Sequence, residues 1–445
     1  MLRRERSHSL DSHLGDDALR RGFIPFFVRP AGRKHGPTPA SCACIYSWSV
    51  GVWVGTISPS GGDSACYTFF MLNALLWIGA GLWIWFMLTF IVNRCFAFAL
   101  DRREVEEPEE WPSVSIVVPA RNEEKGIRES VTSFCEQDYA DFEVVVVDDR
   151  SADATPRIIE ELSERYPRLR VIAGAEPPEG WLGKPHALEQ GRKAGTGEWY
   201  LFVDADVVYA PDLLRRAVAY VKREKADMLF LAPDFTTGDP LELALISSLY
   251  VMGSAVIPLF LAVRSRTKLI AAGGGVFNLV RREMVEASGA FESLKGAVID
   301  DLELGYRVKW AGGRQAGALA GRLIRIRMYE GGLATIRGFT KNTYPGLIRV
   351  PWALALPFVL GSIVSLLPYY GFFEALARGS WSLPATISLT LMHAVMAGIA
   401  WTFRQPWYLT FLNPLREVGW WWVLFRSWLV YRRRGLVWRG RSYGK

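Results

Sequence analysis

The sequence predicts an α/β fold in which a mostly parallel sheet is flanked by membrane-spanning helices at both ends. Between about residues 112 and 330, short runs rich in Val, Ile and Phe alternate with helical stretches. These runs are apolar throughout instead of alternating, which is typical of strands buried on both faces of a parallel sheet. Long apolar segments lie before residue 99 and after residue 345, and they are long enough to cross a bilayer.

The first long apolar segment begins at Met71 with MLNALLWIGAGLWIWF. The part from about residue 72 to residue 92 could span a bilayer as a helix, so we expect an N-terminal transmembrane helix over residues 71–98. Arg94 and further basic residues follow it, which places its C-terminal end on the cytoplasmic side. Residues 1–70 have no hydrophobic periodicity and no signal-peptide order, so we expect them to be disordered or an upstream extension.

The central domain is expected to contain five strands separated by four helices. The predicted strands are VSIVVPA, FEVVVVDD, LRVIAG, WYLFVDAD and DMLFLAP, and the predicted helices cover residues 123–137, 154–165, 185–194 and 211–224. The apolar residues 241–263 interrupt this series. If they spanned the membrane, the two halves of the domain would lie on opposite sides. We therefore expect an interfacial or buried helix pair, broken near Pro258.

A C-terminal membrane region is expected over residues 345–431. Residues 347–373 and 385–403 are good spanning candidates, and the Trp- and Arg-rich segment EVGWWWVLFRSWLVYRRR is an interfacial helix or a third span. Residues 432–445 form a basic tail that the positive-inside rule places in the cytoplasm. We therefore predict a multi-pass protein of the cell (inner) membrane whose catalytic domain is cytoplasmic.

Composition supports a membrane protein and gives no support for a nucleic-acid-binding one. The net charge is +7 and the pI is near 9.1, but the basic residues lie beside apolar segments and form no basic-aromatic module. The five cysteines have no paired spacing, so neither a zinc site nor a disulfide framework is expected.

Two pairs of carboxylates follow predicted strands, where open α/β sheets bind ligands. Asp148 and Asp149 end one strand and could accept hydrogen bonds from a base or a ribose, although Ser151 or Asp153 capping the next helix would explain the same pattern. Asp204 and Asp206 end another strand. Side chains two residues apart in an extended segment point the same way, so both could face one Mg²⁺ or Mn²⁺ ion that bridges a diphosphate. Asp206 is the expected direct ligand.

Alternative interpretations of Asp204 and Asp206 are a plain polar strand end and the nucleophile motif of haloacid-dehalogenase-type phosphatases. That motif usually lies on the first strand of its domain, whereas here three predicted strands precede it. The motif alone does not decide between these interpretations.

A third acidic cluster and two further segments complete the candidate site. Asp300 and Asp301 stand at a predicted helix start, where they could cap the helix or supply a general base. Gly273–Gly275 could let a bound sugar approach the backbone, or could be a plain loop. Lys184 is a candidate phosphate contact, whereas His186 has no catalytic partner nearby and is expected to be structural.

Together these segments resemble the family 2 glycosyltransferases of the GT-A fold. The ordered set is VSIVVPARNEE, VVVVDDRSADAT, GKPHALEQG, VDAD and IDDLELG, which covers about residues 112–330. The segment MYEGGLATIRGFTKNTYPGL and the terminal VWRGRSY are similar to the membrane-bound hopanoid-associated and carotenoid-type members. The QxxRW motif of processive polysaccharide synthases does not occur after this point in the sequence.

The resemblance implies an inverting transfer from a nucleotide-sugar donor, expected to be UDP-linked, with a divalent metal. It places Glu123 and Asp149 at nucleotide contacts, with Asp204 and Asp206 on the metal. It also makes Asp301 the catalytic base, with Asp300 standing where the family usually has Glu. The expected acceptor is a lipid such as a hopanoid or carotenoid. Polysaccharide synthesis and a non-catalytic GT-A membrane scaffold remain the alternatives.

Overall fold

The computed structural model describes residues 62–265, 267–297, 299–347, 352–434, 436–438 and 441–443. The chain divides into two compact units, Met1–Ala74 and Leu75–Lys445, and nearly all described residues belong to the second. Our prediction for residues 1–70 falls mostly outside the described residues. Residues 62–70 already belong to helix α1 (Gly62–Phe96), which begins before the helix predicted over residues 71–98.

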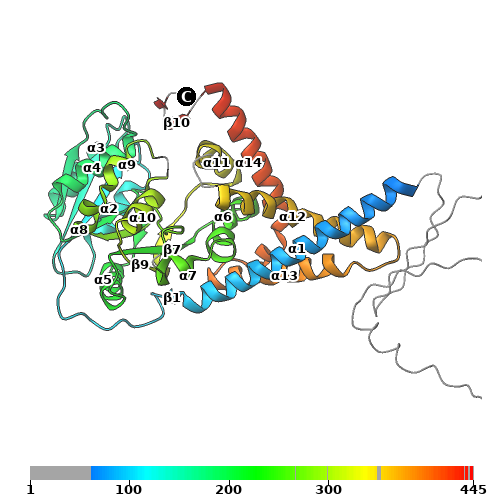
Figure 1. Cartoon of the computed structure of the whole chain (residues 1–445). Helices are drawn as coiled ribbons and strands as arrows, with labels where there is room; N and C mark the ends of the chain where they lie inside the picture. The colour runs from blue at the N-terminus through cyan, green and yellow to red at the C-terminus, as the bar shows by residue number, and fades with distance from the viewer. Residues whose placement is uncertain are drawn as a thin grey trace, which may run out of the picture. The chain divides into compact units, whose positions relative to one another are not determined.

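A nine-stranded sheet forms the centre of the second unit in the described part of the chain (Figure 1). Its strands are β1 (Phe98–Ala99), β2 (Val114–Ala120), β3 (Phe142–Asp148), β4 (Leu169–Ala173), β5 (Trp199–Phe202), β6 (Val207–Tyr209), β7 (Met228–Phe235), β8 (Asn278–Arg281) and β9 (Gln315–Ile326). The order across the sheet is β1-β9-β7-β8-β5-β2-β3-β4, and β6 pairs with β9 outside this path.

Most neighbouring strands are parallel, which confirms the predicted fold class. Strand β2 pairs in parallel with β3 and β5, β4 with β3, and both β7 and β1 with β9. Strand β8 is antiparallel to both β5 and β7, and β6 is antiparallel to β9. The carboxyl ends of β2, β3 and β5 therefore meet at one edge of the sheet, beside the amino end of β8.

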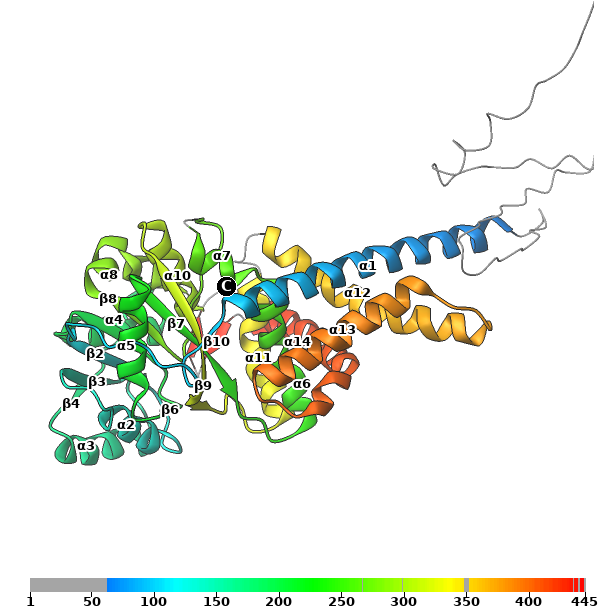
Figure 2. The ribbon, with the colours of Figure 1, turned by 90° about the horizontal axis from the view of Figure 1, so that it is seen from below.

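Helices cover both faces of the sheet, as the continuous apolar strands predicted. One face packs against α2 (Ile127–Cys135), α3 (Thr155–Arg165) and α5 (Leu213–Arg223). The other packs against α4 (Gly183–Ala194), α8 (Arg282–Ser288), α9 (Ala290–Leu294) and α10 (Asp300–Trp310). Figure 2 shows α2 and α3 on one side of the strands and α4 and α8 on the other.

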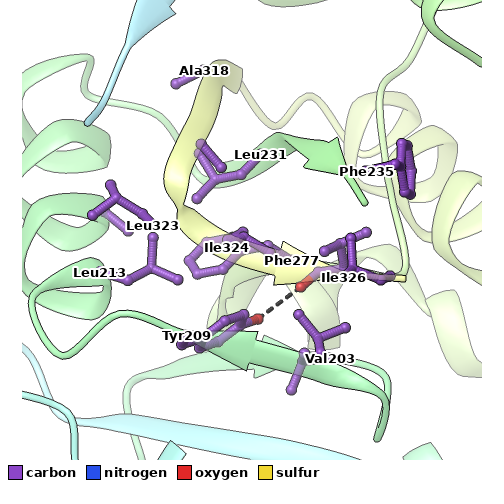
Figure 3. Packing of buried hydrophobic residues seen from close by; sticks show 14 of the residues in the cluster. Val203, Tyr209, Leu213, Leu231, Phe235, Phe277, Ala318, Leu323, Ile324 and Ile326 are labelled. Carbon is purple, nitrogen blue, oxygen red and sulfur yellow. Dashed lines mark hydrogen bonds between the residues drawn. The ribbon is translucent and has the colours of Figure 1, made fainter. Parts of the chain in front are cut away.

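The core at the end of β9 fixes the loop that precedes β8. Ile324 and Leu323 of β9 pack among Leu213 and Phe277 in the same buried cluster (Figure 3). Within this cluster the Tyr209 hydroxyl donates a hydrogen bond of 2.7 Å to the carbonyl of Val276. The backbone just before β8 is therefore held in place by a buried side chain of β6.

The apolar insertion after β7 forms the predicted broken helix pair. Helix α6 (Pro240–Val251) continues into a π-helical turn, η2 (Met252–Val256), and α7 (Leu259–Arg264) follows Pro258. Asn93 of α1 supports the break, because its amide nitrogen donates to the carbonyls of Ser254 and Ile257 at 3.0 and 2.8 Å. This contact satisfies carbonyl groups that the interrupted helix leaves without a partner.

Three helices among the described residues are long and apolar enough to cross a membrane. They are the Phe70–Phe96 part of α1, the Val359–Ala377 part of α12 (Trp352–Ala377) and α13 (Leu383–Thr402). Helix α14 (Asn413–Arg434) is not among these long apolar helices. Helix α11 (Gly332–Leu347) packs against α14. The basic tail contains two short antiparallel strands, β10 (Leu436–Trp438) and β11 (Arg441–Tyr443).

Arg404, in the turn after α13, ties the sheet to the apolar helices. Its guanidinium donates to Asp234 of β7 at 2.8 Å and also pairs with Asp101, just after β1. Next to it, Gln405 donates to the carbonyl of Phe235 at 3.2 Å. Because Arg forms fixed, forked hydrogen bonds, this cluster holds the sheet edge and the end of α13 in one arrangement.

Candidate active site

The candidate site lies at the sheet edge where β2, β3 and β5 end. Asp204 stands two residues after β5, Asp149 directly after β3, and Glu123 three residues after β2. From the other side, α10 brings Asp300 and Asp301, and α4 brings Lys184. A small cleft joins these elements, and its lining includes Lys184, Phe202, Asp204, Asn278, Asp300 and Asp301.

Lys184 connects two of the predicted carboxylates. Its ammonium lies 2.8 Å from Oδ1 of Asp204 and 3.2 Å from Oδ1 of Asp300. Burial alone would lower the pKa of Lys184, but the charges of Asp204, Asp300 and Asp301 outweigh it and raise the pKa above its ordinary value. Lys184 therefore stays protonated, and a positive charge sits against the first aspartate of the Asp-Ala-Asp motif.

Asp300 is buried beneath this lysine. Desolvation raises the pKa of its carboxyl above the usual range; Lys184 opposes this shift, and the charges of Asp301 and Asp204 add to it. Asp300 therefore holds the ammonium of Lys184 from below. Its neighbour Asp301 is less buried.

Asp301 does not cap its helix, which was the alternative interpretation of this pair. The residue before α10 is Ile299, and no side chain caps the helix there. Instead, Oδ2 of Asp301 accepts a hydrogen bond of 2.6 Å from the backbone N–H of Gly275, and Oδ1 accepts one of 2.8 Å from Leu302. Two backbone donors thus hold the carboxylate in one orientation.

Gly275 links Asp301, the predicted base, with Asp204, a predicted metal ligand, through its backbone. Its N–H donates to Asp301, and its carbonyl accepts a hydrogen bond of 2.9 Å from the N–H of Asp204. Buried Gln315 at the start of β9 holds the same segment, because it bonds both the N–H and the carbonyl of Ala272 and also the carbonyl of Gly305. The glycine-rich segment is therefore a fixed wall of the site.

Position 275 requires glycine because the Asp204 carboxylate lies too close for a Cβ atom. A Cβ there would lie 2.6 Å from Oδ2 of Asp204, whereas a Cβ at Gly274 would meet open space. We expect Gly275→Ala to displace the Asp204 carboxylate and to lower turnover at this site about 100-fold, because a small misplacement of a catalytic group has effects of that size. Gly274→Ala is the matched control.

This prediction is checked by comparing steady-state catalytic rates of the two variants with the unaltered protein. Melting temperatures measured in parallel separate a local effect from loss of the fold. Equal activity in Gly275→Ala and Gly274→Ala would show that the position of Asp204 does not matter for catalysis.

Asp206 is exposed as a residue, but its carboxylate lies among protein atoms and close to two other acidic groups. Desolvation, Asp204 and Glu123 raise the pKa of Asp206 above the usual range. Burial and the charge of Asp206 raise the pKa of Tyr329, in the loop before α11, to about 12. Asp204, Asp206 and Glu123 therefore share one electrostatic environment, and the Tyr329 loop borders it.

Asp148 and Asp149 take different roles. The carboxylate of Asp148 accepts a hydrogen bond of 3.3 Å from the N–H of Ser151, within the turn that follows β3. The alternative was Ser151 or Asp153 as the cap of the next helix; the N-cap of α3 is Ala154, without a side-chain cap, although Asp153 accepts from the N–H of Thr155 at 3.0 Å. Asp149 is buried, with Arg121 and Arg150 each 3.6 Å from its carboxylate. The structure thus brings Asp149 to the same sheet edge as Asp204, while Asp148 is engaged in its own turn.

The carboxylate oxygens at this site suit a hard divalent cation that also binds phosphate oxygens and water. Among the described residues no group of three or more His, Cys, Asp or Glu gathers to hold a metal ion, and the predicted ligands are the two carboxylates Asp204 and Asp206. Mg²⁺ is commonly bound by one or two carboxylates together with phosphate oxygens and water. The cation of Lys184 against Asp204 shows that this position accommodates positive charge. The residues present therefore fit Mg²⁺ or Mn²⁺ carried with a diphosphate.

Sequence reasoning missed Gln315, Tyr209 and Tyr329. Gln315 and Tyr209 act through buried contacts to backbone atoms more than 40 residues away in the chain, for which a single sequence carries no signal. The ring of His186, which we expect to be structural, packs edge-on against Trp181, and its Nδ1 lies 3.2 Å from Gln190.

Comparison with known proteins shows which family the central domain resembles. Residues 115–289 match the family model "Glycosyl transferase family 2". The beta-monoglucosyldiacylglycerol synthase of Trichormus variabilis is 29% identical over 209 residues, 45% of this chain and 42% of that protein. The 4,4'-diaponeurosporenoate glycosyltransferase of Staphylococcus haemolyticus is 24% identical over 57% of this chain and 66% of that protein. The chain thus spans less than half of the first relative.

Among solved structures, the mannosyltransferase PcManGT from Pyrobaculum calidifontis, in complex with GDP-Man and Mn²⁺, is similar with a TM-score of 0.49 and 20% identity. The match covers 81% of this chain and 99% of that one. The matched family model begins within β2 and ends just after α8, so it includes Glu123, Asp149, Lys184 and Asp204. Residues 115–289 are therefore a family 2 glycosyltransferase domain.

Proposed function

We propose that this protein transfers a sugar from a nucleotide-sugar to a lipid acceptor at the membrane, with inversion at the anomeric carbon and with Mg²⁺ or Mn²⁺. The observation that carries the proposal is the joint placement of Lys184, Asp204 and Asp301 around the backbone of Gly275, within a family 2 domain. A cation site and an oriented carboxylate thereby face one cleft.

The donor end of the reaction is assigned to Asp204, Asp206 and Lys184. The metal, when bound, would neutralise charge that develops on the departing diphosphate. Lys184 donates hydrogen bonds to a phosphate oxygen, and Asp149 and Glu123 lie at the strand ends where the nucleoside would bind. We expect a UDP-linked donor.

The acceptor end is assigned to Asp301. Its carboxylate removes the proton of the acceptor hydroxyl as that oxygen attacks the anomeric carbon. The bond between the anomeric carbon and the diphosphate oxygen breaks in the same step, and the nucleoside diphosphate leaves. The backbone N–H groups of Gly275 and Leu302 hold the Asp301 carboxylate in its orientation during this step, because they remain hydrogen-bonded to it.

A lipid-like acceptor is supported by two independent observations. Three described helices are apolar enough to span a bilayer, and they belong to the same unit as the site from Leu75 onward. Two relatives carry names with apolar acceptors, diacylglycerol and diaponeurosporenoate. We propose an inner-membrane, multi-pass protein whose catalytic domain is cytoplasmic, with a glycerolipid, carotenoid or hopanoid as the acceptor.

The test is release of nucleoside diphosphate by the purified full-length protein from a panel of nucleotide-sugars, with Mn²⁺ and membrane lipid extract. We expect release that needs both metal and lipid, and a loss of about 100-fold or more in Asp204→Ala/Asp206→Ala. Equal rates in this variant and the unaltered protein would contradict the metal site. Release of inorganic phosphate would indicate a phosphatase, and no release with any donor would indicate a scaffold.

A further inference from the structure

A second cavity lies away from the sheet edge, among the apolar helices. Its lining comes from α1, α6, η2, α12 and α14 and includes Trp83, Phe86, Ser248, Gly361, Arg416 and Trp420. Trp83 and Phe86 stand near the middle of the candidate span Phe70–Phe96, and Gly361 stands in the first turn of the candidate span Val359–Ala377. The cavity is therefore bordered by helices that face lipid in the proposed membrane arrangement.

Two charged side chains of α14 are buried beside this cavity. Arg416 and Glu417 are 4% and 5% exposed, and they form an ion pair of 2.5 Å although they are consecutive residues. Ser248 of α6 also lines the cavity, and its hydroxyl has no hydrogen-bond partner among the described residues. Buried ionisable and unpaired polar groups among membrane helices are costly and typically mark a functional site.

The backbone at the cavity is also irregular. Met252 and Val256, at the two ends of the π-helical turn η2, line it. Such turns cost helical hydrogen bonds and are frequent at functional sites. Asn93 of α1 holds this turn in place, so the irregularity is supported by a specific contact.

Helix α6 connects the cavity with the Tyr329 loop, which borders the candidate active site. At its start, buried Glu242 accepts from the N–H of Gly331 at 3.1 Å, and Asp239 accepts from the N–H of Gly332 at 2.8 Å. These bonds hold the loop that contains Tyr329, next to Asp206. From Glu242 to Ser248 the rise along the helix is about 9 Å, which is well within the length of one lipid molecule.

We infer that this small cavity receives the polar end of a neutral membrane amphiphile, the acceptor class of the proposed function, on which this inference rests. Arg416 and Ser248 would donate hydrogen bonds to an uncharged oxygen of the lipid, such as an ester carbonyl or a hydroxyl. Trp83, Phe86 and Trp420 would pack against its apolar part. A neutral lipid is favoured over an anionic one because Glu417 already balances the charge of Arg416.

Two variants test the site by different routes. Gly361→Leu adds carbons to a residue that lines the cavity, and a Cβ there would make an ordinary contact of 3.5 Å with Phe86. Arg416→Met combined with Glu417→Gln removes both charges together. The matched control is Arg378→Met with Glu374→Gln, an ion pair of 2.6 Å at the end of α12 in which Arg378 is 60% exposed and Glu374 21%.

The measurement is thermal unfolding of delipidated full-length protein in dodecyl maltoside, with and without dioleoylglycerol, together with native mass spectrometry. We expect dioleoylglycerol to raise the melting temperature of the unaltered protein and the control by about 3 °C or more, with one lipid retained. Both cavity variants should lose most of this shift. No shift in the unaltered protein, or a full shift in Gly361→Leu, would overturn the inference.

The binding readout needs no sugar transfer, so it separates this inference from the proposed function. Asp301→Asn should keep the full dioleoylglycerol shift. If lipid binding is lost in the cavity variants but no nucleotide-sugar supports transfer in the unaltered protein, the cavity stands and the proposed function fails. If transfer to dioleoylglycerol is unchanged in Gly361→Leu, the function stands and the cavity is not the acceptor site.

Discussion

Asp301→Asn should lower kcat about 1,000-fold with little change in the KM for the nucleotide-sugar. General-base catalysis contributes about 100- to 10,000-fold, and an amide cannot take up the proton of the acceptor hydroxyl. The donor is held by other groups, so its binding should survive. Steady-state transfer with varied donor concentration separates the two constants.

A control is needed because the substitution also changes the local hydrogen bonds. Asparagine retains one acceptor oxygen, so it can keep the bond from either Gly275 or Leu302 but not both. Mn²⁺ affinity and melting temperature should therefore be measured alongside. Asp300→Asn is the comparison variant: it should act through Lys184, raising the donor KM and lowering kcat much less.

The outcome also identifies the chemical class of the acceptor. A hydroxyl must lose a proton to attack the anomeric carbon, whereas a phosphate acceptor is already ionised and needs no base. A kcat within about tenfold of the unaltered protein would contradict the base assignment and favour a phosphate acceptor instead.

The sheet and the position of the carboxylates were predictable because both depend on local pattern. Unbroken apolar runs such as FEVVVVD predicted strands buried on both faces, and the parallel pairing of β2 with β3 and β5 then brought Asp149 and Asp204 to one edge. The break at Pro258 was equally local, because proline cannot continue a helix hydrogen-bond ladder.

What escaped prediction depends on contacts between distant segments. The sequence placed Asp301 at a helix start, where capping is the usual role, but the carboxylate bonds Gly275 because β8 runs antiparallel beside β5. Likewise, Arg404 meets Asp234 and Asp101 across 170 and 303 residues of sequence. Such pairs become visible only when the strand order is known.

Lys184→Met should change the binding of metal and of nucleotide in opposite directions. The lysine ammonium lies 2.8 Å from Asp204, the first of the two proposed metal ligands, so it competes with a metal ion for the same negative charge. At this distance the attraction is worth a few kcal/mol near a protein surface, so we expect Mn²⁺ alone to bind about tenfold more tightly without it. UDP should bind about 10- to 100-fold more weakly in the presence of Mn²⁺, because a charged hydrogen bond to its phosphate is lost.

Both affinities can be measured by calorimetry on the full-length protein, first with Mn²⁺ alone and then with UDP at saturating Mn²⁺. Lys193→Met is the matched control, because Lys193 lies on the same helix, is 67% exposed and pairs with Glu189 away from the site. Weaker Mn²⁺ binding in Lys184→Met would mean that the lysine organises Asp204 for the metal instead of competing with it. Opposite shifts would establish that Lys184 occupies the cation position until the donor arrives and then turns to the diphosphate, which would explain how a site with two clustered acid pairs stays stable before any substrate binds.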